Sequence, residues 1–137
     1  MPNTLKTCLV ALAATLISAV ALADARSIPY TAEAFAEAQE AGNFIVVDVY
    51  ADWCPTCRAQ KPTLDELKGE PALADALFVV VDFDTDKEFL REHRIARQST
   101  ILLFDGAQEI DRSVAETDRE RLRAFVLDAA TASMPAE

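Results

Sequence analysis

A near-continuous apolar segment, residues 44–50, leads directly into the motif Trp53-Cys54-Pro55-Thr56-Cys57. Its β-branched residues are typical of a strand that is buried on both faces of a sheet. The cysteines then fall where this strand gives way to a helix. The sequence therefore predicts a reversible disulfide between Cys54 and Cys57 at a strand-to-helix junction.

A bond between Cys54 and Cys57 would add little to stability. It closes a loop of about four residues, for which chain entropy gives about 2 kcal/mol, against about 4.7 kcal/mol for a hundred-residue loop. Unpaired amide N–H groups and the helix dipole stabilise a thiolate at a helix start. We interpret the pair as redox-active, with Cys54 as the more exposed nucleophile and Cys57 as the resolving thiol. Metal binding by the same sulfurs remains an alternative.

Residues 1–23 are predicted to be a secretory signal peptide, which leaves residues 24–137 as one domain. Lys6 precedes an apolar run, and Ala21-Leu22-Ala23 fits a cleavage site. An uncleaved membrane anchor is the alternative, although the run is shorter than the roughly 20 residues that span a bilayer. Cleavage would remove Cys8. Export predicts a periplasmic location, where disulfides form and persist.

The formal net charge of −10 argues against nucleic acid and anionic lipid as partners. The chain has no second cysteine pair, and its one histidine, His93, lies in a polar segment that we expect at the surface. No metal site and no cofactor are therefore predicted.

The rest of the chain alternates between helix and strand patterns. Helices are predicted over 31–41, 54–68 (kinked at Pro62), 87–93 and 117–130, the last opened by a capping box at Thr117. Strands are predicted over 44–50, 77–83, 100–104 and 109–114, with a turn at Asp105-Gly106. This order predicts an α/β fold with a central mixed β-sheet flanked by helices on both faces.

These motifs resemble the thioredoxin superfamily over essentially the whole predicted domain. The residues that carry the resemblance keep the family's spacing: Asp48, Trp53, Cys54, Cys57, Pro62 and Ile101-Leu102-Leu103-Phe104. The resemblance implies a thioredoxin-like fold and thiol–disulfide oxidoreductase activity. The segment WCPTCR is similar to exported reductases of cytochrome c maturation, and Ala51-Asp52-Trp53-Cys54 is similar to the thioredoxin-like domains of transmembrane thiol reductases.

The resemblance also suggests residue roles. Asp48 is expected beneath Cys57, as a buried acid that accepts its proton directly or through water; a core acid hydrogen-bonded to backbone is the alternative. Val80 stands near where many thioredoxins carry a lysine, so we expect Asp48 to be harder to ionise. The expected substrate-binding residues are Trp53, Pro55, Thr56, Gln98 and Ser99.

Ser99 occupies the slot where the family places a cis-proline. A cis peptide before a non-proline residue costs about 3–4 kcal/mol, so the Gln98–Ser99 bond is predicted to be trans. The Ser99 hydroxyl is expected near Cys54, where it would stabilise the thiolate, and the Gln98 backbone is expected to offer an edge to a bound peptide. Loss of the proline also favours capture of a metal or iron–sulfur cluster.

The sequence therefore predicts an exported thiol–disulfide oxidoreductase that reduces protein disulfides and exchanges electrons with a membrane thiol donor. We expect a monomer. Two alternatives stay open: a metal or iron–sulfur protein that uses the same two cysteines, and a redox-inactive peptide-binding module.

Overall fold

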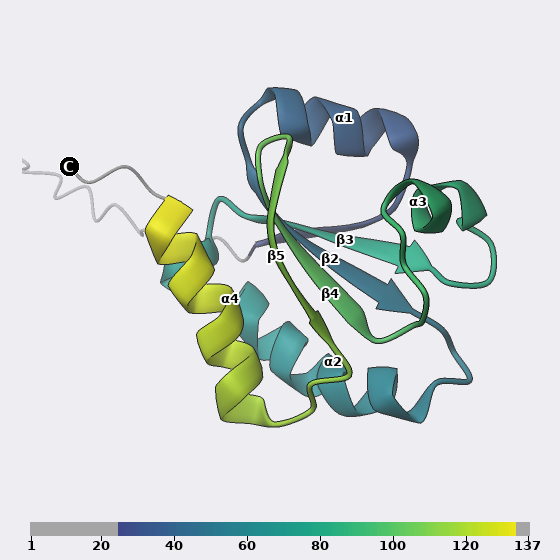
Figure 1. Ribbon diagram of the computed structural model, residues 1–137. Helices are drawn as coiled ribbons and strands as arrows, with labels where there is room; N and C mark the ends of the chain where they lie inside the picture. Colours follow the sequence, from purple (N-terminus) through teal and green to yellow (C-terminus); the bar gives the residue numbers. More distant parts are fainter. Residues whose placement is uncertain (1–24, 134–137) are drawn as a thin grey trace, which may run out of the picture.

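The computed structural model describes residues 25–133 and holds a five-stranded sheet between two layers of helices (Figure 1). The strands are β1 Arg26–Pro29, β2 Phe44–Tyr50, β3 Leu77–Asp82, β4 Thr100–Asp105 and β5 Gln108–Val114. The helices are α1 Ala32–Glu40, α2 Pro55–Lys68, α3 Lys87–Glu92 and α4 Arg119–Ser133, with a 3₁₀ turn η1 at Pro71–Leu73. None of these helices has the length and apolar character to cross a bilayer. The predicted signal peptide, residues 1–23, lies outside the described residues.

The sheet is mixed, as predicted. Its strand order is β1-β3-β2-β4-β5. The strands β1, β3 and β2 run parallel, and β4 and β5 are each antiparallel to the preceding neighbour in that order. Because β2 lies at the centre between β3 and β4, side chains on both of its faces are covered, which explains its apolar sequence.

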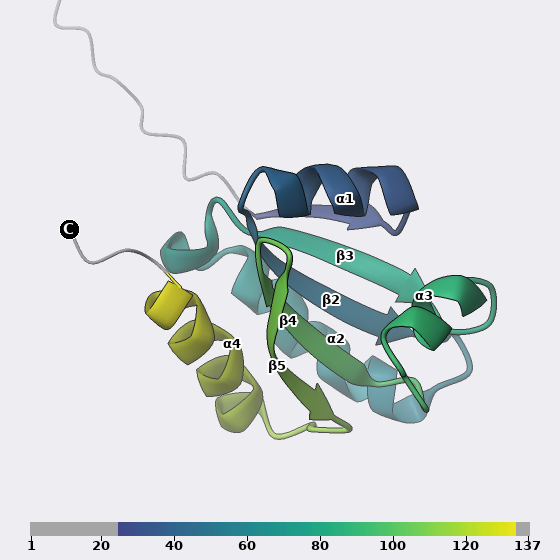
Figure 2. The same ribbon diagram turned by 45° about the horizontal axis from the view of Figure 1, so that its top comes forward.

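The two faces of the sheet carry separate hydrophobic cores. Val47 and Val49 of β2 pack on one face with the buried residues of α1 and α3. Val46 packs on the other with those of α2 and α4. Figure 2 shows the two helix pairs on opposite sides of the strands. Since side chains alternate along a strand, Asp48 shares the face of Val46, towards α2.

The helix starts follow side-chain caps. Thr31 accepts a hydrogen bond from the amide of Ala34 at 3.1 Å and begins α1, as predicted. The predicted cap of the last helix, Thr117, is wrong by one residue. The Asp118 carboxylate accepts from the amide of Arg121 at 2.9 Å, and α4 begins at Arg119. A charged carboxylate is a strong N-cap acceptor, so the helix starts after it.

Two short elements, β1 and η1, were not predicted. β1 has four residues, is mostly exposed and ends in Pro29, so its sequence shows no strand pattern. It forms because its backbone pairs with β3 from Arg26 opposite Leu77 to Pro29 opposite Val80. Tertiary pairing therefore decides this strand.

The expectation that His93 lies at the surface is also wrong. The ring is half-buried, and its centroid lies 4.2 Å from that of Phe89. It also meets Phe35 and Phe104 edge to face. Burial lowers the pKa of His93, so the ring is held neutral as part of an aromatic cluster.

We predict that Ile101→Ala lowers the free energy of unfolding by about 3 kcal/mol, because Ile101 is fully buried in the core beneath α2 and α4. Urea unfolding measures the loss. The matched control is Ile110→Ala, since Ile110 is 37% exposed, and we expect a change within about 0.5 kcal/mol. Equal losses for the two variants would contradict this description of the core.

Candidate active site

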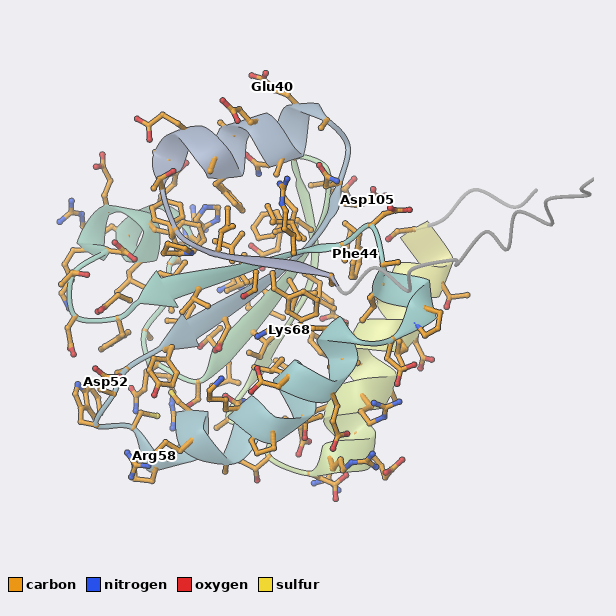
Figure 3. The ribbon with its side chains drawn as sticks, turned by 180° about the vertical axis from the view of Figure 1, so that it is seen from behind. Glu40, Phe44, Asp52, Arg58, Lys68 and Asp105 are labelled. Carbon is orange, nitrogen blue, oxygen red and sulfur yellow. The ribbon has the colours of Figure 1, made fainter. Side chains whose placement is uncertain are left out.

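The cysteine pair lies where β2 gives way to α2. Cys54 is the N-cap of α2, and its sulfur accepts a hydrogen bond from the amide of Cys57 at 3.1 Å. Pro55 occupies the first turn, where a missing N–H removes no intrahelical bond. Figure 3 shows Asp52 and Arg58 at this end of the molecule, and the Arg58 guanidinium donates to the Asp52 carbonyl at 2.9 Å. The amino end of α2 therefore points at the Cys54 sulfur, as predicted.

Ser99 lies against both sulfurs. Its Oγ is 3.1 Å from Cys54 Sγ and 3.2 Å from Cys57 Sγ. The predicted contact with Cys54 is confirmed, and the contact with Cys57 is an addition. The Gln98–Ser99 bond is trans, as predicted, since residues 25–133 contain no cis peptide. One hydroxyl thus connects the two thiols.

The two thiol pKa values shift in opposite directions, although the Ser99 hydroxyl lowers both. Burial by itself raises the pKa of Cys54, but hydrogen bonds from Cys57, from Ser99 and from the Cys57 amide outweigh it, so the pKa is lowered. Burial and the bond to Cys54 raise the pKa of Cys57, against the opposing effect of Ser99. Cys54 is therefore the more acidic thiol of the pair, and Cys57 is the less acidic.

The two cysteine side chains hardly differ in solvent exposure, although Cys54 has fewer protein atoms around it than Cys57 and so lies nearer the surface, as expected. Cys54 is 0% exposed and Cys57 is 2% exposed. They form a small cluster with Ala51, against which Tyr50 and Phe83 pack. With water excluded, the hydrogen bonds to the Cys54 sulfur act in a low dielectric and are stronger than at an open surface.

The backbone holds Ser99 in an unusual conformation. Its φ is 63°, the left-handed region, which costs a residue with a side chain about 1–2 kcal/mol. Its N–H donates to the Val49 carbonyl at 2.8 Å, and its carbonyl accepts from the Ala115 amide at 2.9 Å. These bonds on both sides keep the hydroxyl aimed at the sulfurs.

Gln60 is a site residue that the sequence analysis missed. It is 1% exposed, and its Nε2 donates to the carbonyls of Ser99 at 3.3 Å and Glu116 at 3.0 Å. It thereby ties α2 to the loop that carries Ser99. The available signal was its position: a glutamine three residues after Cys57, on the helix face that also carries Leu64 and Leu67.

Asp48 is a carboxylate whose burial disfavours its charged form. Its Oδ1 is buried and has no hydrogen-bond partner among the described residues, so the alternative of a satisfied core acid is wrong. Burial raises its pKa from 3.8 to about 6, although Lys68 and Lys61 act against the shift. The expectation that Asp48 is hard to ionise is confirmed.

A pocket of about 220 Å³ leads to Asp48 between the sheet and α2. Val80 lies directly opposite Asp48 in the β2–β3 register and lines this pocket, so no charge reaches Asp48 from that strand position. Lys61 and Lys68 line it from α2, where both pair with Asp65 at 2.8 Å. The positive charge near Asp48 therefore comes from the helix.

The predicted substrate-binding residues surround the pair. Trp53 is 54% exposed, and its Nε1 donates to Asp84 at 2.8 Å, which fixes the ring at the surface. Pro55 is exposed and Thr56 half-buried. The side chain of half-buried Gln98 is close enough to contribute to lowering the Cys54 pKa. Within residues 25–133 no group of three or more His, Cys, Asp or Glu side chains is arranged to hold a metal ion.

Comparison with known proteins identifies the family. The thioredoxin family model matches residues 26–128. The chain belongs to the thioredoxin family. It is 32% identical to the H-type thioredoxin of Fagopyrum esculentum over 98 residues, which are 71% of this chain and 82% of that protein. Thioredoxins are thiol–disulfide oxidoreductases, so Cys54 and Cys57 form a redox pair.

Two further matches define how far the thioredoxin likeness extends. The crystal structure of Trxlp from Edwardsiella tarda EIB202 has 42% identity and a TM-score of 0.71, and covers 73% of this chain and 97% of that one. The bifunctional thioredoxin reductase/thioredoxin of Mycobacterium leprae is 31% identical over 108 residues, which are 74% of this chain. Those residues are 23% of that protein, so the chain spans less than a quarter of it.

We predict that Ser99→Ala slows alkylation of Cys54 by iodoacetamide about tenfold at pH 7 and moves the pH midpoint of that reaction upwards. The variant removes a hydrogen bond to a charged sulfur, worth about 1.5–3 kcal/mol. The matched control is Ser113→Ala on β5, which should react like the native protein. An unchanged midpoint in Ser99→Ala would show that the hydroxyl does not stabilise the thiolate.

We predict that Asp48→Asn raises the free energy of unfolding at pH 8, on the order of 2 kcal/mol, and raises it less at pH 5. The raised pKa of about 6 means that folded Asp48 holds a proton which the unfolded chain, with a pKa near 3.8, has released. Stability is therefore lost as the pH rises through about 4 to 6, and the penalty is complete above that window. Urea unfolding at the two pH values measures the difference. A gain that does not grow with pH would contradict the buried charge.

Proposed function

We propose that this thioredoxin-family protein is an exported reductase of protein disulfides. The observation that carries the proposal is the Cys54 sulfur at the amino end of α2, where the Cys57 amide donates to it at 3.1 Å and the Ser99 hydroxyl lies 3.1 Å away: these bonds lower the pKa of Cys54 against its burial, whereas burial and the bond to Cys54 raise the pKa of Cys57. A stable staple would not need this difference. A nucleophile and a resolving group do.

In the first step the Cys54 thiolate attacks one sulfur of a partner's disulfide. The partner's S–S bond breaks, a mixed disulfide with Cys54 forms, and the partner's other sulfur leaves as a thiolate. The Ser99 hydroxyl and the Cys57 amide, which stabilised the thiolate, remain beside the new bond. The exposed face of Trp53, next to Cys54 in the chain, supplies a surface against which the partner docks.

In the second step Cys57 loses its proton and attacks Cys54 Sγ. The Cys54–Cys57 disulfide forms, and the partner leaves with both of its sulfurs reduced, so two electrons have passed to it. We assign Asp48 as the acceptor of that proton through intervening water, since among the described residues no direct contact joins it to Cys57; its Oδ1 lacks a partner, and its pKa of about 6 suits exchange near neutral pH. Burial of the Asp48 carboxylate lowers the stability of the fold, which supports a functional role for this residue.

The reducing direction and the export are parts of the proposal that rest on sequence. The signal-like residues 1–23 and the resemblance of WCPTCR to exported reductases favour work in the periplasm. The described part of the chain carries only Cys54 and Cys57, so each turnover needs electrons from another protein. A membrane thiol donor fits that compartment, and a role in cytochrome c maturation is one use of the same chemistry. We expect the protein to act as a monomer.

We predict that Cys57→Ser accumulates mixed disulfides with its natural partners when it is expressed with its leader. Without the resolving thiol, the bond between Cys54 and the partner cannot be displaced from within. Non-reducing electrophoresis followed by mass spectrometry would identify both electron donors and substrates.

The matched control is Cys54→Ser, which lacks the nucleophile and should trap nothing. A Cys57→Ser protein that captures no partner, or that is recovered from the cytoplasm only, would argue against the proposal. Captured proteins that normally carry free thiols rather than disulfides would indicate the oxidising direction instead.

A further inference from the structure

Residues 25–133 hold twelve lysines and arginines, of which six form salt bridges and six do not: Arg26, Arg58, Lys87, Arg91, Arg94 and Arg97. Six lysines and arginines form salt bridges with carboxylates on α2, β5, α4 and the segments beside them: Lys61, Lys68, Arg112, Arg119, Arg121 and Arg123. Within residues 25–133, Lys87, Arg91 and Arg94 have no carboxylate within salt-bridge distance. These three cations come from α3 and the turn that follows it.

Lys87, Arg91 and Arg94 line one open groove of about 480 Å³, which we call the α3 groove. Its other lining residues are mostly apolar and include Phe83 and Leu90. The Lys87 ammonium lies 4.8 Å from the centre of the Phe83 ring and donates to the Phe83 carbonyl at 2.7 Å. The groove therefore combines an apolar floor with a positively charged rim, and no carboxylate lines it.

The acidic residues near α3 interact with groups outside the α3 groove. Burial raises the pKa of Tyr30, and the charges of Glu92, Asp86, Glu88 and Glu33 raise it further. Asp82 accepts from the amides of Asp84 and Thr85, and Asp84 accepts from Trp53. Asp86 accepts from the amide of Asp82. These carboxylates keep their charge, but among the described residues none lies within salt-bridge distance of Lys87, Arg91 or Arg94, which are therefore available to a ligand.

Arg94 is held in a backbone conformation that opposes its side chain. Its φ is 53°, and the amides of Arg94 and Ile95 bond to the carbonyls of Arg91 at 3.2 Å and Leu90 at 2.8 Å. This is a Schellman helix ending, in which the left-handed position favours glycine or asparagine. The positive charge suits the carboxyl end of the helix, but the left-handed backbone disfavours a residue with a side chain, and an outlier of this kind supports a hypothesis of function for that side chain.

The α3 groove is continuous with the redox site. Phe83 lines the groove, packs against the cluster of Ala51, Cys54 and Cys57, and meets the ring of Trp53 edge to face. Figure 1 shows α3 at the same end of the sheet as the arrowheads of β2 and β3, where α2 begins. A polypeptide whose disulfide reaches Cys54 can therefore extend over Phe83 into the groove.

We propose that the α3 groove binds an acidic segment next to the disulfide of the protein substrate. This inference rests on the proposed reductase function and names the substrate class for the same site. Carboxylates of the segment pair with Arg91 and Arg94, while its apolar side chains cover Phe83. Charges at such a rim act mainly on association rate and its salt dependence. The remaining acidic surface repels partners that approach with the same charge elsewhere, so acidic substrates are directed to this groove.

The test uses synthetic peptides that share one internal disulfide and differ only in flanking residues: glutamates, glutamines or lysines. Reduction by the full domain is followed with dithiothreitol as electron source, at low and high ionic strength. We expect kcat/KM for the glutamate peptide to exceed that for the glutamine peptide by about threefold to tenfold at low salt, with the lysine peptide slowest. High salt should reduce this preference.

The variant is the pair Arg91→Gln and Arg94→Asn, in which asparagine tolerates the left-handed backbone, so Tm should not fall. We expect the glutamate-to-glutamine ratio of kcat/KM to drop to about one. The matched control is Arg26→Gln: Arg26 is exposed, forms no salt bridge with described residues, and begins β1 at the far end of the sheet. It should keep the native ratio.

The outcomes separate the two proposals. Equal kcat/KM for all peptides with the native protein, or an unchanged glutamate-to-glutamine ratio in the double variant, would overturn the proposed role of the α3 groove. The proposed reductase function would be unaffected. A native protein that reduces none of the peptides would overturn both. If the glutamate-to-glutamine ratio of kcat/KM falls equally in Arg26→Gln, the effect comes from net charge alone, and the proposal that the α3 groove binds acidic segments is overturned.

Discussion

The chemistry of this protein depends on one hydroxyl held between two sulfurs. Ser99 Oγ contacts Cys54 and Cys57 at nearly equal distances, inside a cluster from which water is excluded. These contacts require the backbone to direct the Ser99 hydroxyl towards the two sulfurs. The left-handed backbone of Ser99 and the bond from Gln60 supply that aim. The aimed hydroxyl lowers the pKa of both thiols, and the difference between them comes from burial and from the hydrogen bonds between the two cysteines.

The same region contains two features that oppose stability. Asp48 is ionised with difficulty beside a pocket, and Arg94 occupies a helix ending that suits glycine. Asp48 lines the pocket between the sheet and α2, and Arg94 lines the α3 groove. A site that must pass protons and receive a partner keeps groups that the fold alone would not select. The ion pairs of α4 and β5, by contrast, are surface pairs of small individual value.

Comparison of the predicted and observed elements shows where sequence patterns suffice. The strand 44–50, the helix after Cys54 and the strand before Gly106 were predicted because apolar periodicity and caps are local signals. β1 was missed, since four exposed residues ending in proline carry no such signal. The burial of His93 was also missed, because exposure depends on side chains that arrive from other segments.

The sequence by itself determined the mixed α/β fold, the redox pair and the helix end that serves Cys54, because each depends on residues adjacent in the chain or on their periodicity. It also placed Ser99 opposite the pair, through resemblance. Only the tertiary structure decided that Ser99 contacts both sulfurs, that Gln60 holds its loop, and that Asp48 receives its positive neighbours from α2. The α3 groove, too, was decided only by the tertiary structure. These features join side chains that lie far apart in the chain, and their distances are set by packing rather than by local propensity.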